Sequence, residues 1–219
     1  MNQLALFAKY WEPGKVKTRL GRDLGEEQAA ELYRMFLATT LRRCEVLGAR
    51  RTLVYSPSNR RDDMALLAGA NWNLEPQADG NLGQRMKKFF RESLTQSSSP
   101  VVLIGSDSPH VPLEYLQKAF ELLEKVPVVL GPSEDGGYYL IGLSQFLPEL
   151  FEGVAWSTPG VLEQTIAKLD ASSNPYELLP TCYDIDDIGD LRRLADEIDP
   201  SPRDIHLAEL QAVLRGSFR

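Results

Sequence analysis

Short apolar segments alternate with amphipathic helical patterns along the chain, and this alternation limits the possible fold more than any other feature. Residues 4–8 and 101–104 read as fully buried strands, whereas residues 26–47 carry apolar side chains at helical spacing. Strands that alternate with helices indicate an α/β fold with a mostly parallel sheet. Because ligands of such sheets bind beyond the carboxyl ends of the strands, the segments that directly follow strands are the candidates for function.

The remaining elements are predicted from the same patterns. Further strands are expected at residues 51–55, 72–74 (at a sheet edge), 126–130, 137–143 and 177–183. Further helices are expected at residues 61–67, 82–94, from Pro112 onward, at 159–169, after a cap at Asp187, and at 203–214.

Length and composition suit one domain that spans residues 1–219. Of the 219 residues, 43% are hydrophobic and 25% charged, and the net charge is −7. That acidic balance argues against duplex nucleic acid as a partner, because proteins that bind it carry a basic face. We expect neither a secretory signal nor a membrane span, since no apolar run is long enough, and the expected location is the cytoplasm.

A basic turn follows the first predicted strand. Residues 9–20 read K-Y-W-E-P-G-K-V-K-T-R-L, in which Pro13 and Gly14 break the strand. The segment supplies four cations in an acidic protein, from Lys9, Lys15, Lys17 and Arg19. Backbone N–H groups and cations together suit a polyphosphate. We expect Lys17 and Arg19 on an exposed loop; the alternative is a solvated basic loop without function.

Two acidic segments also follow predicted strands. Asp107 comes directly after residues 101–104, where a carboxylate can hold a hard cation such as Mg²⁺. Capping of the next helix by Asp107 or Ser108 is the alternative. In the second segment, Asp184 and Asp186 point to the same side if the chain is extended. Asp186 is then a candidate second carboxylate for the metal at Asp107, although a solvated acidic turn explains the segment alone.

A glycine pair lies between two predicted strands in the segment E-D-G-G-Y-Y. Gly136 and Gly137 allow a ligand to approach the backbone closely, and Asp135 and Tyr138 can bind hydroxyl groups. A tight turn without function explains the glycines equally well.

Two helix-entry segments offer further contacts. Gln84 and Arg85 open the helix at residues 82–94 and are candidates to bind a base or a phosphate. Trp156 and Ser157 precede the predicted helix at residues 159–169 and could flank a substrate, or Ser157 could simply cap that helix.

Several common chemistries are not supported. No Walker A spacing, no G-x-G-x-x-G after a strand and no G-x-S-x-G elbow occur in the sequence. The two histidines, His110 and His206, argue against a histidine-rich metal site.

Taken in order, four motifs resemble the GT-A-type nucleotide-diphospho-sugar transferases, a superfamily that includes small nucleotidylyltransferases. They are K-Y-W-E-P-G-K-V-K-T-R-L at Lys9, G-S-D-S-P at Gly105, E-D-G-G-Y-Y-L-I-G-L at Glu134 and Y-D-I-D-D at Tyr183. The chain looks closest to a bacterial subfamily of glycosyltransferases, part of which is associated with arsenosugar biosynthesis. The resemblance covers nearly the whole chain.

The resemblance implies a single-domain, Rossmann-like GT-A fold, with three α/β/α layers and a mostly parallel mixed sheet of about seven strands. Two departures from the pattern stand out. Trp11 replaces a proline that relatives often carry, and Asp186-Asp187-Ile188 stands where relatives have Asp-Thr-Pro.

Together, the motifs and the resemblance define the expected site. Catalytic roles fall to Lys17, Arg19 and Asp107, and the metal ligands are Asp107 and Asp186. The nucleotide-binding residues are Ala8, Lys9, Gly14, Lys17, Arg19, Gln84, Arg85, Ser106 and Asp107. The substrate-binding residues are Asp135, Gly136, Gly137, Tyr138, Trp156 and Ser157.

The expected activity is a Mg²⁺- or Mn²⁺-dependent glycosyl transfer from a nucleotide sugar to a small-molecule acceptor. The first alternative is a nucleotidylyltransferase that joins a nucleoside triphosphate to a phosphorylated small molecule, since the same residues serve both reactions. The second is a non-catalytic nucleotide-binding module. Neither a nucleic acid nor a membrane is an expected partner.

Overall fold

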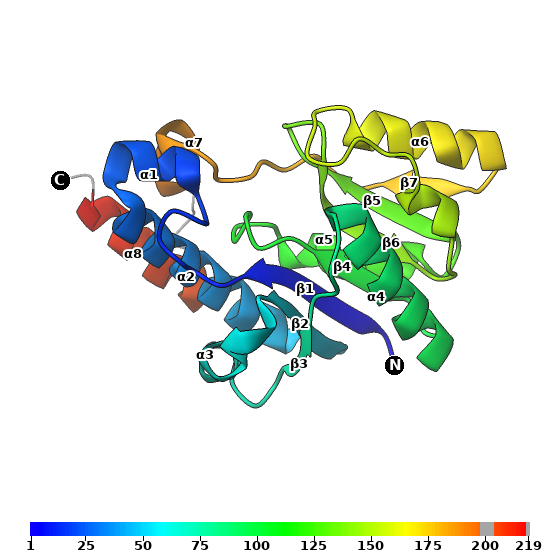
Figure 1. Cartoon of the computed structure of the whole chain (residues 1–219), viewed down its shortest axis with the longest axis horizontal. Helices are drawn as coiled ribbons and strands as arrows, with labels where there is room; N and C mark the ends of the chain where they lie inside the picture. The colour runs from blue at the N-terminus through cyan, green and yellow to red at the C-terminus, as the bar shows by residue number, and fades with distance from the viewer. Residues whose placement is uncertain (198–203, 218–219) are drawn as a thin grey trace.

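The predicted strands assemble into one seven-stranded sheet in the order β3-β2-β1-β4-β6-β5-β7 (Figure 1). The computed structural model describes residues 1–197 and 204–217. Among the described strands only β6 runs antiparallel, to both of its neighbours β4 and β5. The strands are β1 (Gln3–Lys9), β2 (Arg50–Ser56), β3 (Asn73–Pro76), β4 (Val101–Ile104), β5 (Val128–Pro132), β6 (Tyr138–Leu143) and β7 (Tyr176–Leu178).

Helices cover both faces of this sheet, so the described residues form one α/β domain with three layers. The α-helices are α1 (Thr18–Leu24), α2 (Glu26–Arg43), α3 (Arg61–Ala68), α4 (Leu82–Gln96), α5 (Leu113–Leu122), α6 (Val161–Ser172), α7 (Ile188–Glu197) and α8 (Ile205–Ser217). Short 3-10 turns occur at Cys44–Val46, Ser58–Arg60 and Pro148–Phe151.

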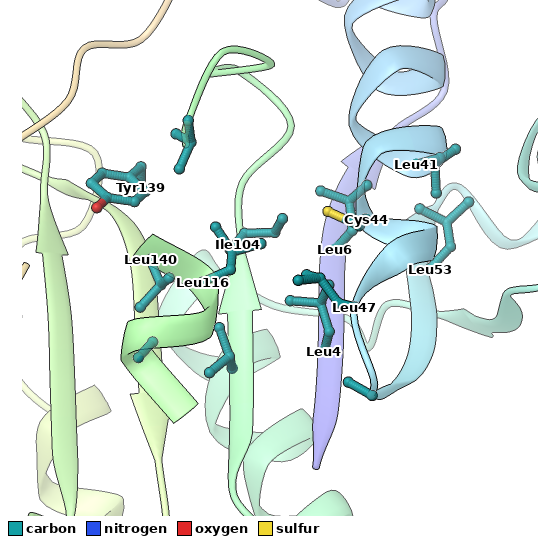
Figure 2. Packing of buried hydrophobic residues seen from close by; sticks show 14 of the residues in the cluster. Leu4, Leu6, Leu41, Cys44, Leu47, Leu53, Ile104, Leu116, Tyr139 and Leu140 are labelled. Atoms are coloured by element: carbon teal, nitrogen blue, oxygen red, sulfur yellow. The ribbon is translucent and has the colours of Figure 1, made fainter. Parts of the chain in front are cut away.

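Alternation along β1 divides the core into two halves. Leu4 and Leu6 face one side, where they pack with side chains of α2, α3 and α5 (Figure 2). Ala5 faces the other side, with side chains of α4 and α6. Because both faces of the central strands are covered, these strands read as continuous apolar runs, which is why the sequence predicted them.

A third apolar cluster lies beyond α2 and joins the two ends of the chain. Leu20 of α1 packs there with Ile185 and with side chains of α7 and α8. These helices gather beside α2 at one end of the molecule (Figure 1). The cluster places the chain around Lys17 next to the chain around Asp186, although 169 positions separate these residues.

Some predicted boundaries are wrong. Pro112 and Gly160 are the N-cap residues of α5 and α6, so α5 begins one residue and α6 two residues later than predicted. The predicted strand at 177–183 ends at Leu178, because Pro180 has no N–H to donate; the ladder resumes as a bridge between Ser133 and Cys182. Arg203, the first residue of the predicted terminal helix, lies outside the described residues. Within residues 1–197 and 204–217, no helix is long and apolar enough to cross a membrane.

Candidate active site

A cleft with two adjoining lobes opens at the carboxyl ends of β1 and β4. These strands lie side by side and parallel, and the chain continues from β1 to one side of the sheet and from β4 to the other. Such a switch in strand order leaves a crevice that binds ligands in open α/β sheets. The larger lobe has a volume of about 670 Å³ and the smaller one about 460 Å³, both in the range of small-molecule sites.

The two lobes share a junction and divide the predicted residues between them. The junction consists of Arg19, Leu82, Asp107, Tyr138, Ser157, Asp184 and Asp186. Predicted nucleotide-binding residues line the larger lobe, namely Ala8, Lys9, Lys17, Arg19, Arg85, Ser106 and Asp107. Predicted substrate-binding residues line the smaller lobe, namely Asp135, Gly137, Tyr138, Trp156 and Ser157.

Three predicted residues do not line either lobe. Gly14 lies within the basic turn, where its backbone has a φ of 74° and packs against the side chain of Glu26. Gln84 closes a capping box instead of facing the cleft: its backbone N–H donates to Asn81 Oδ1, and its side-chain oxygen accepts the Asn81 N–H. That reciprocal pair satisfies the helix end, so Gln84 has a structural role.

Gly136 is the third predicted residue that lines neither lobe, and its geometry supports the alternative of a tight structural turn. Its backbone has φ of 86°, and an added Cβ would lie 1.9 Å from the carbonyl oxygen of Pro159. The Gly136 carbonyl also accepts the Leu162 N–H at 2.9 Å. The residue therefore fixes the turn against the start of α6, whereas its neighbour Gly137 lines the smaller lobe.

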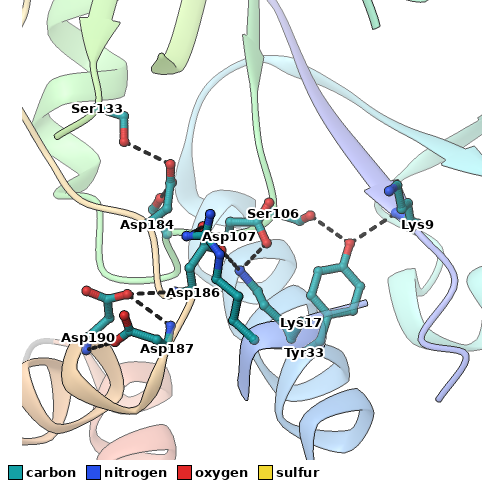
Figure 3. Close-up of polar contacts among 12 residues, drawn as sticks. Lys9, Lys17, Tyr33, Ser106, Asp107, Ser133, Asp184, Asp186, Asp187 and Asp190 are labelled. Carbon is teal, nitrogen blue, oxygen red and sulfur yellow. Dashed lines mark hydrogen bonds and ion pairs between the residues drawn. The ribbon is translucent and has the colours of Figure 1, made fainter. Parts of the chain in front are cut away.

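Lys17 lines the larger lobe beside the junction, where it is bound to both predicted metal ligands (Figure 3). Its ammonium contacts Asp107 and lies 3.2 Å from Asp186 Oδ1, and only 3% of its side chain is exposed. The expectation of an exposed loop is therefore wrong for Lys17. The basic turn leads into α1, which the sequence analysis missed, and a left-handed backbone at Lys17 turns the side chain inward.

The electrostatics keep Lys17 charged. Burial lowers the pKa of Lys17, but the charges of Asp107 and Asp186 and their hydrogen bonds outweigh it, so this pKa lies above its ordinary value of 10.5. Arg19 is the outer cation of the group: its Nη1 is 3.7 Å from Asp186 Oδ2, and its side chain is 70% exposed. Arg19 thus matches the expected exposed position and is free to reach a ligand.

The start of α7 holds Asp186 in place. Asp187 Oδ1 accepts the backbone N–H groups of Gly189 and Asp190, which confirms the predicted cap. Asp190 Oδ2 in turn accepts the N–H groups of Asp186 and Asp187. The departure from the family's Thr-Pro pattern therefore still gives a closed helix entry that fixes the backbone of Asp186.

Tyr33 of α2 links the end of β1 to the loop that follows β4, a role that the sequence analysis missed. Its hydroxyl accepts the Lys9 N–H at 3.0 Å and hydrogen-bonds the Ser106 hydroxyl at 2.7 Å (Figure 3). Burial, and then the charge of Asp107, raise the pKa of Tyr33, so its hydroxyl stays protonated. Because Tyr33 lies on the apolar stripe of its helix, its pattern indicated only a core residue.

Asp184 supports the loop that carries Asp107. Its carboxylate accepts hydrogen bonds from the hydroxyls of Ser108 and Ser133, the latter at 2.8 Å. Burial raises the pKa of Asp184, although these hydrogen bonds act in the opposite direction. Neither Asp107 nor Ser108 caps α5, so the capping explanation is wrong for both residues.

Gln77 and Arg85 form a fixed pair at the far end of the larger lobe. The Gln77 amide donates to the carbonyls of Ala8 and Val54, each at 3.0 Å, and its oxygen accepts from Arg85 Nη1 at 2.8 Å. Gln77 follows β3 directly, so the strand-end rule would have identified it. The pair holds the predicted contact Arg85 at the cleft wall.

An aromatic wall closes the smaller lobe. Trp156 and Tyr138 pack edge to face, with ring centroids 6.5 Å apart. The indole lies so close to α4 that a Cβ on Gly83 would be 2.1 Å from its Nε1. Only glycine at this helix position leaves room for Trp156 beside the lobe.

At the junction, Asp107 and Asp186 are the residues that would hold a divalent metal. Asp107 and Asp186 approach one cation, the Lys17 ammonium, and offer oxygen ligands only. Within residues 1–197 and 204–217 no group of three or more metal-ligating side chains occurs. Two carboxylates without a full protein cage are typical of Mg²⁺ bound together with phosphates and water.

Known proteins share this architecture. A family model for DUF2064, described as an uncharacterized protein conserved in bacteria, matches residues 40–158. A crystal structure from Desulfovibrio desulfuricans G20, described as a "putative nucleotide-diphospho-sugar transferase", has 33% sequence identity and a TM-score of 0.88. The alignment covers 98% of this chain and 97% of that one. Among curated proteins, none matches the chain.

More distant structures share the fold alone. A cytidylyltransferase from Leptospira borgpetersenii has 14% identity and a TM-score of 0.56, over 99% of this chain and 94% of that one. A manganese complex of Rv0371C from Mycobacterium tuberculosis has 13% identity and a TM-score of 0.55, over 90% and 99%.

Proposed function

Because the chain belongs to the bacterial DUF2064 family and is a transferase of the nucleotide-diphospho-sugar transferase fold, we propose that it transfers a glycosyl group from a nucleotide sugar to a small-molecule acceptor. The nucleotide occupies the larger lobe and the acceptor occupies the smaller lobe. The observation that carries this proposal is the ion-paired group of Lys17, Arg19, Asp107 and Asp186, which lies where the two lobes meet.

Charge supports a diphosphate at this junction. The larger lobe is lined by five basic residues, Lys9, Lys15, Lys17, Arg19 and Arg85, against three aspartates. Lys17 is the inner donor and Arg19 the outer one, so the two can hold a diphosphate from different sides. Tyr33 holds the Lys9 backbone and the Ser106 side chain together next to this site, through hydrogen bonds to both.

Asp107 and Asp186 are the residues that would hold Mg²⁺ or Mn²⁺. When bound, the metal supplies positive charge that stabilises the leaving diphosphate. In the transfer, an acceptor hydroxyl oxygen bonds to the anomeric carbon and the bond from that carbon to the diphosphate breaks. The hydroxyl proton passes to the released diphosphate or to solvent. Lys17 and Arg19 stabilise the charge that develops on the diphosphate oxygens.

Nucleotidylyl transfer is the second candidate, and the fold likeness to a cytidylyltransferase favours it. In that reaction a phosphate of the acceptor attacks the α-phosphorus of a nucleoside triphosphate, and pyrophosphate leaves. The two reactions release different products, a nucleoside diphosphate or pyrophosphate.

The test combines binding and product analysis. Titration calorimetry with a panel of nucleotide sugars and nucleoside triphosphates, with and without Mn²⁺, identifies the donor, and ³¹P NMR then identifies the product. Glycosyl transfer predicts release of a nucleoside diphosphate. Pyrophosphate as the product would establish the second candidate, and tight binding without any turnover would indicate a non-catalytic module.

A matched pair of variants tests the metal ligand. Asp107→Asn should remove the increase in nucleotide affinity that Mn²⁺ gives the wild type, which we expect to be at least tenfold. Asp23→Asn, at an exposed position of α1, should change nothing. Equal Mn²⁺ dependence in both variants would refute the metal role of Asp107.

A further inference from the structure

We infer that the smaller lobe takes an uncharged, hydroxyl-rich acceptor with one apolar face and rejects a phosphomonoester. This inference rests on the proposed function, since it names the acceptor of the same reaction. It is carried by the charge and by the surface chemistry of the lobe, which differ sharply from those of the larger lobe.

The first argument is charge. Among the described residues that line the smaller lobe, four are aspartates, Asp107, Asp135, Asp184 and Asp186, and one is basic, Arg19. Arg19 also faces the larger lobe and is already near Asp186, at 3.7 Å. Lys17 and Arg19 already pair with Asp107 and Asp186, so a phosphate here would face Asp135 and Asp184, which have no ion-pair partner among the described residues, and like charges at close range weaken binding.

The second argument is the wall. Trp156 and Tyr138 present aromatic surface to the lobe, and Gly83 leaves the space in which the indole sits. An indole face suits the C–H side of a sugar ring or a similar polyol. Carboxylate and hydroxyl groups nearby, from Asp135 and Ser157, accept hydrogen bonds from hydroxyl groups.

The consequence separates the two candidate reactions. Nucleotidylyl transfer needs a phosphate on the acceptor, placed within reach of the junction. The smaller lobe disfavours such a group, whereas a hydroxyl acceptor of glycosyl transfer fits it. The lobe thus supports glycosyl transfer by an argument independent of family resemblance.

Ion quenching of tryptophan fluorescence measures the potential in the lobe directly. Trp72 is buried, so in Trp11→Phe the quenchable signal comes from Trp156, and in Trp156→Phe it comes from Trp11 in the basic turn. We expect the ratio of caesium to iodide quenching to be at least twofold higher for Trp156 than for Trp11. Asp135→Asn in the Trp11→Phe background should lower this ratio, and Asp170→Asn, exposed on α6, should not.

Paired sugars measure the preference itself. With Trp156 fluorescence as the readout, glucose should bind at least tenfold more tightly than glucose 6-phosphate, and Asp135→Asn should narrow this difference. An equal or lower quenching ratio at Trp156, or glucose 6-phosphate binding as tightly as glucose, would overturn the inference. If neither sugar binds, the quenching ratio alone decides. Neither measurement requires a nucleotide, so failure of glycosyl transfer in the product assay is a separate result.

Discussion

Replacing Lys17 with methionine should weaken the folded state while making the junction a better metal site. Methionine keeps much of the length and apolar volume of the lysine side chain but removes the charge between Asp107 and Asp186. Removal of one partner from a fully buried ion pair costs about 3–5 kcal/mol. Here the two carboxylates remain 45% and 41% exposed, so water recovers part of the loss. We expect a loss of about 1–3 kcal/mol in the free energy of unfolding.

Urea denaturation measures this loss of stability and the extent to which metal binding reverses it. With a slope of about 2 kcal/mol/M, the midpoint should fall by about 0.5–1.5 M. Mn²⁺ should then stabilise Lys17→Met more than the wild type when no nucleotide is present, because the ammonium no longer competes for the carboxylates. Affinity for a nucleoside diphosphate should fall, since a charge-assisted contact is lost.

Arg19→Met is the matched control. Arg19 is exposed, so its replacement should change stability by no more than about 0.5 kcal/mol while still weakening diphosphate binding. The reasoning is refuted if Lys17→Met is as stable as the wild type and binds Mn²⁺ no more tightly. In that case Lys17 would not compensate the two carboxylates.

Three further predictions concern positions around the cleft. Tyr33→Phe should cost about 1–3 kcal/mol and weaken nucleotide affinity, because two strand-end groups lose their partner; unchanged calorimetric affinity would contradict this. Gly136→Ala should lower the free energy of unfolding, measured by urea denaturation, by about 1–3 kcal/mol, because of its positive φ and the nearby Pro159 carbonyl. Gly137→Ala should stay near wild-type stability, and the reverse order of stabilities would disprove the turn assignment. Burial, and then nearby Arg43, lower the pKa of His110 to about 4, so between pH 6.5 and 4 the unfolded chain binds more protons and stability falls as the pH falls. His110→Phe, which keeps the ring contact with Tyr183, should flatten this slope, and parallel pH profiles would count against it.

The sheet and most helices were predictable because their signals are local. Fully apolar runs marked β1 and β4, and the stripe from Ala29 to Leu41 marked α2. The helix α1 was missed because it has only seven residues and no side-chain cap at Lys17. Its position depends on Leu20 packing with helices from the other end of the chain, which no local pattern reveals.

Residues of the candidate site were predictable where a polar side chain directly follows a strand, and less so where its position depends on tertiary contacts. Asp107 and Asp186 were identified by position, and the structure brings them to one cation. The burial of Lys17 was missed because both of its partners are distant in sequence. Gln84 was assigned to the cleft because its polar character suited a ligand, whereas the capping box uses that character for the helix end.

The family model covers residues 40–158, yet Lys17 and Asp186 lie outside this range and form an ion pair with each other. They are held together by a cluster built from α1, α7 and α8, so the two termini form one cooperative folding unit around the junction. A fragment limited to the family match would retain the strand that carries Asp107 but lose the cation beside it. Trimming this protein from its C-terminal end therefore removes Asp186 before it reaches β7, whereas trimming from the N-terminal end removes the central strand β1 before it reaches Lys17.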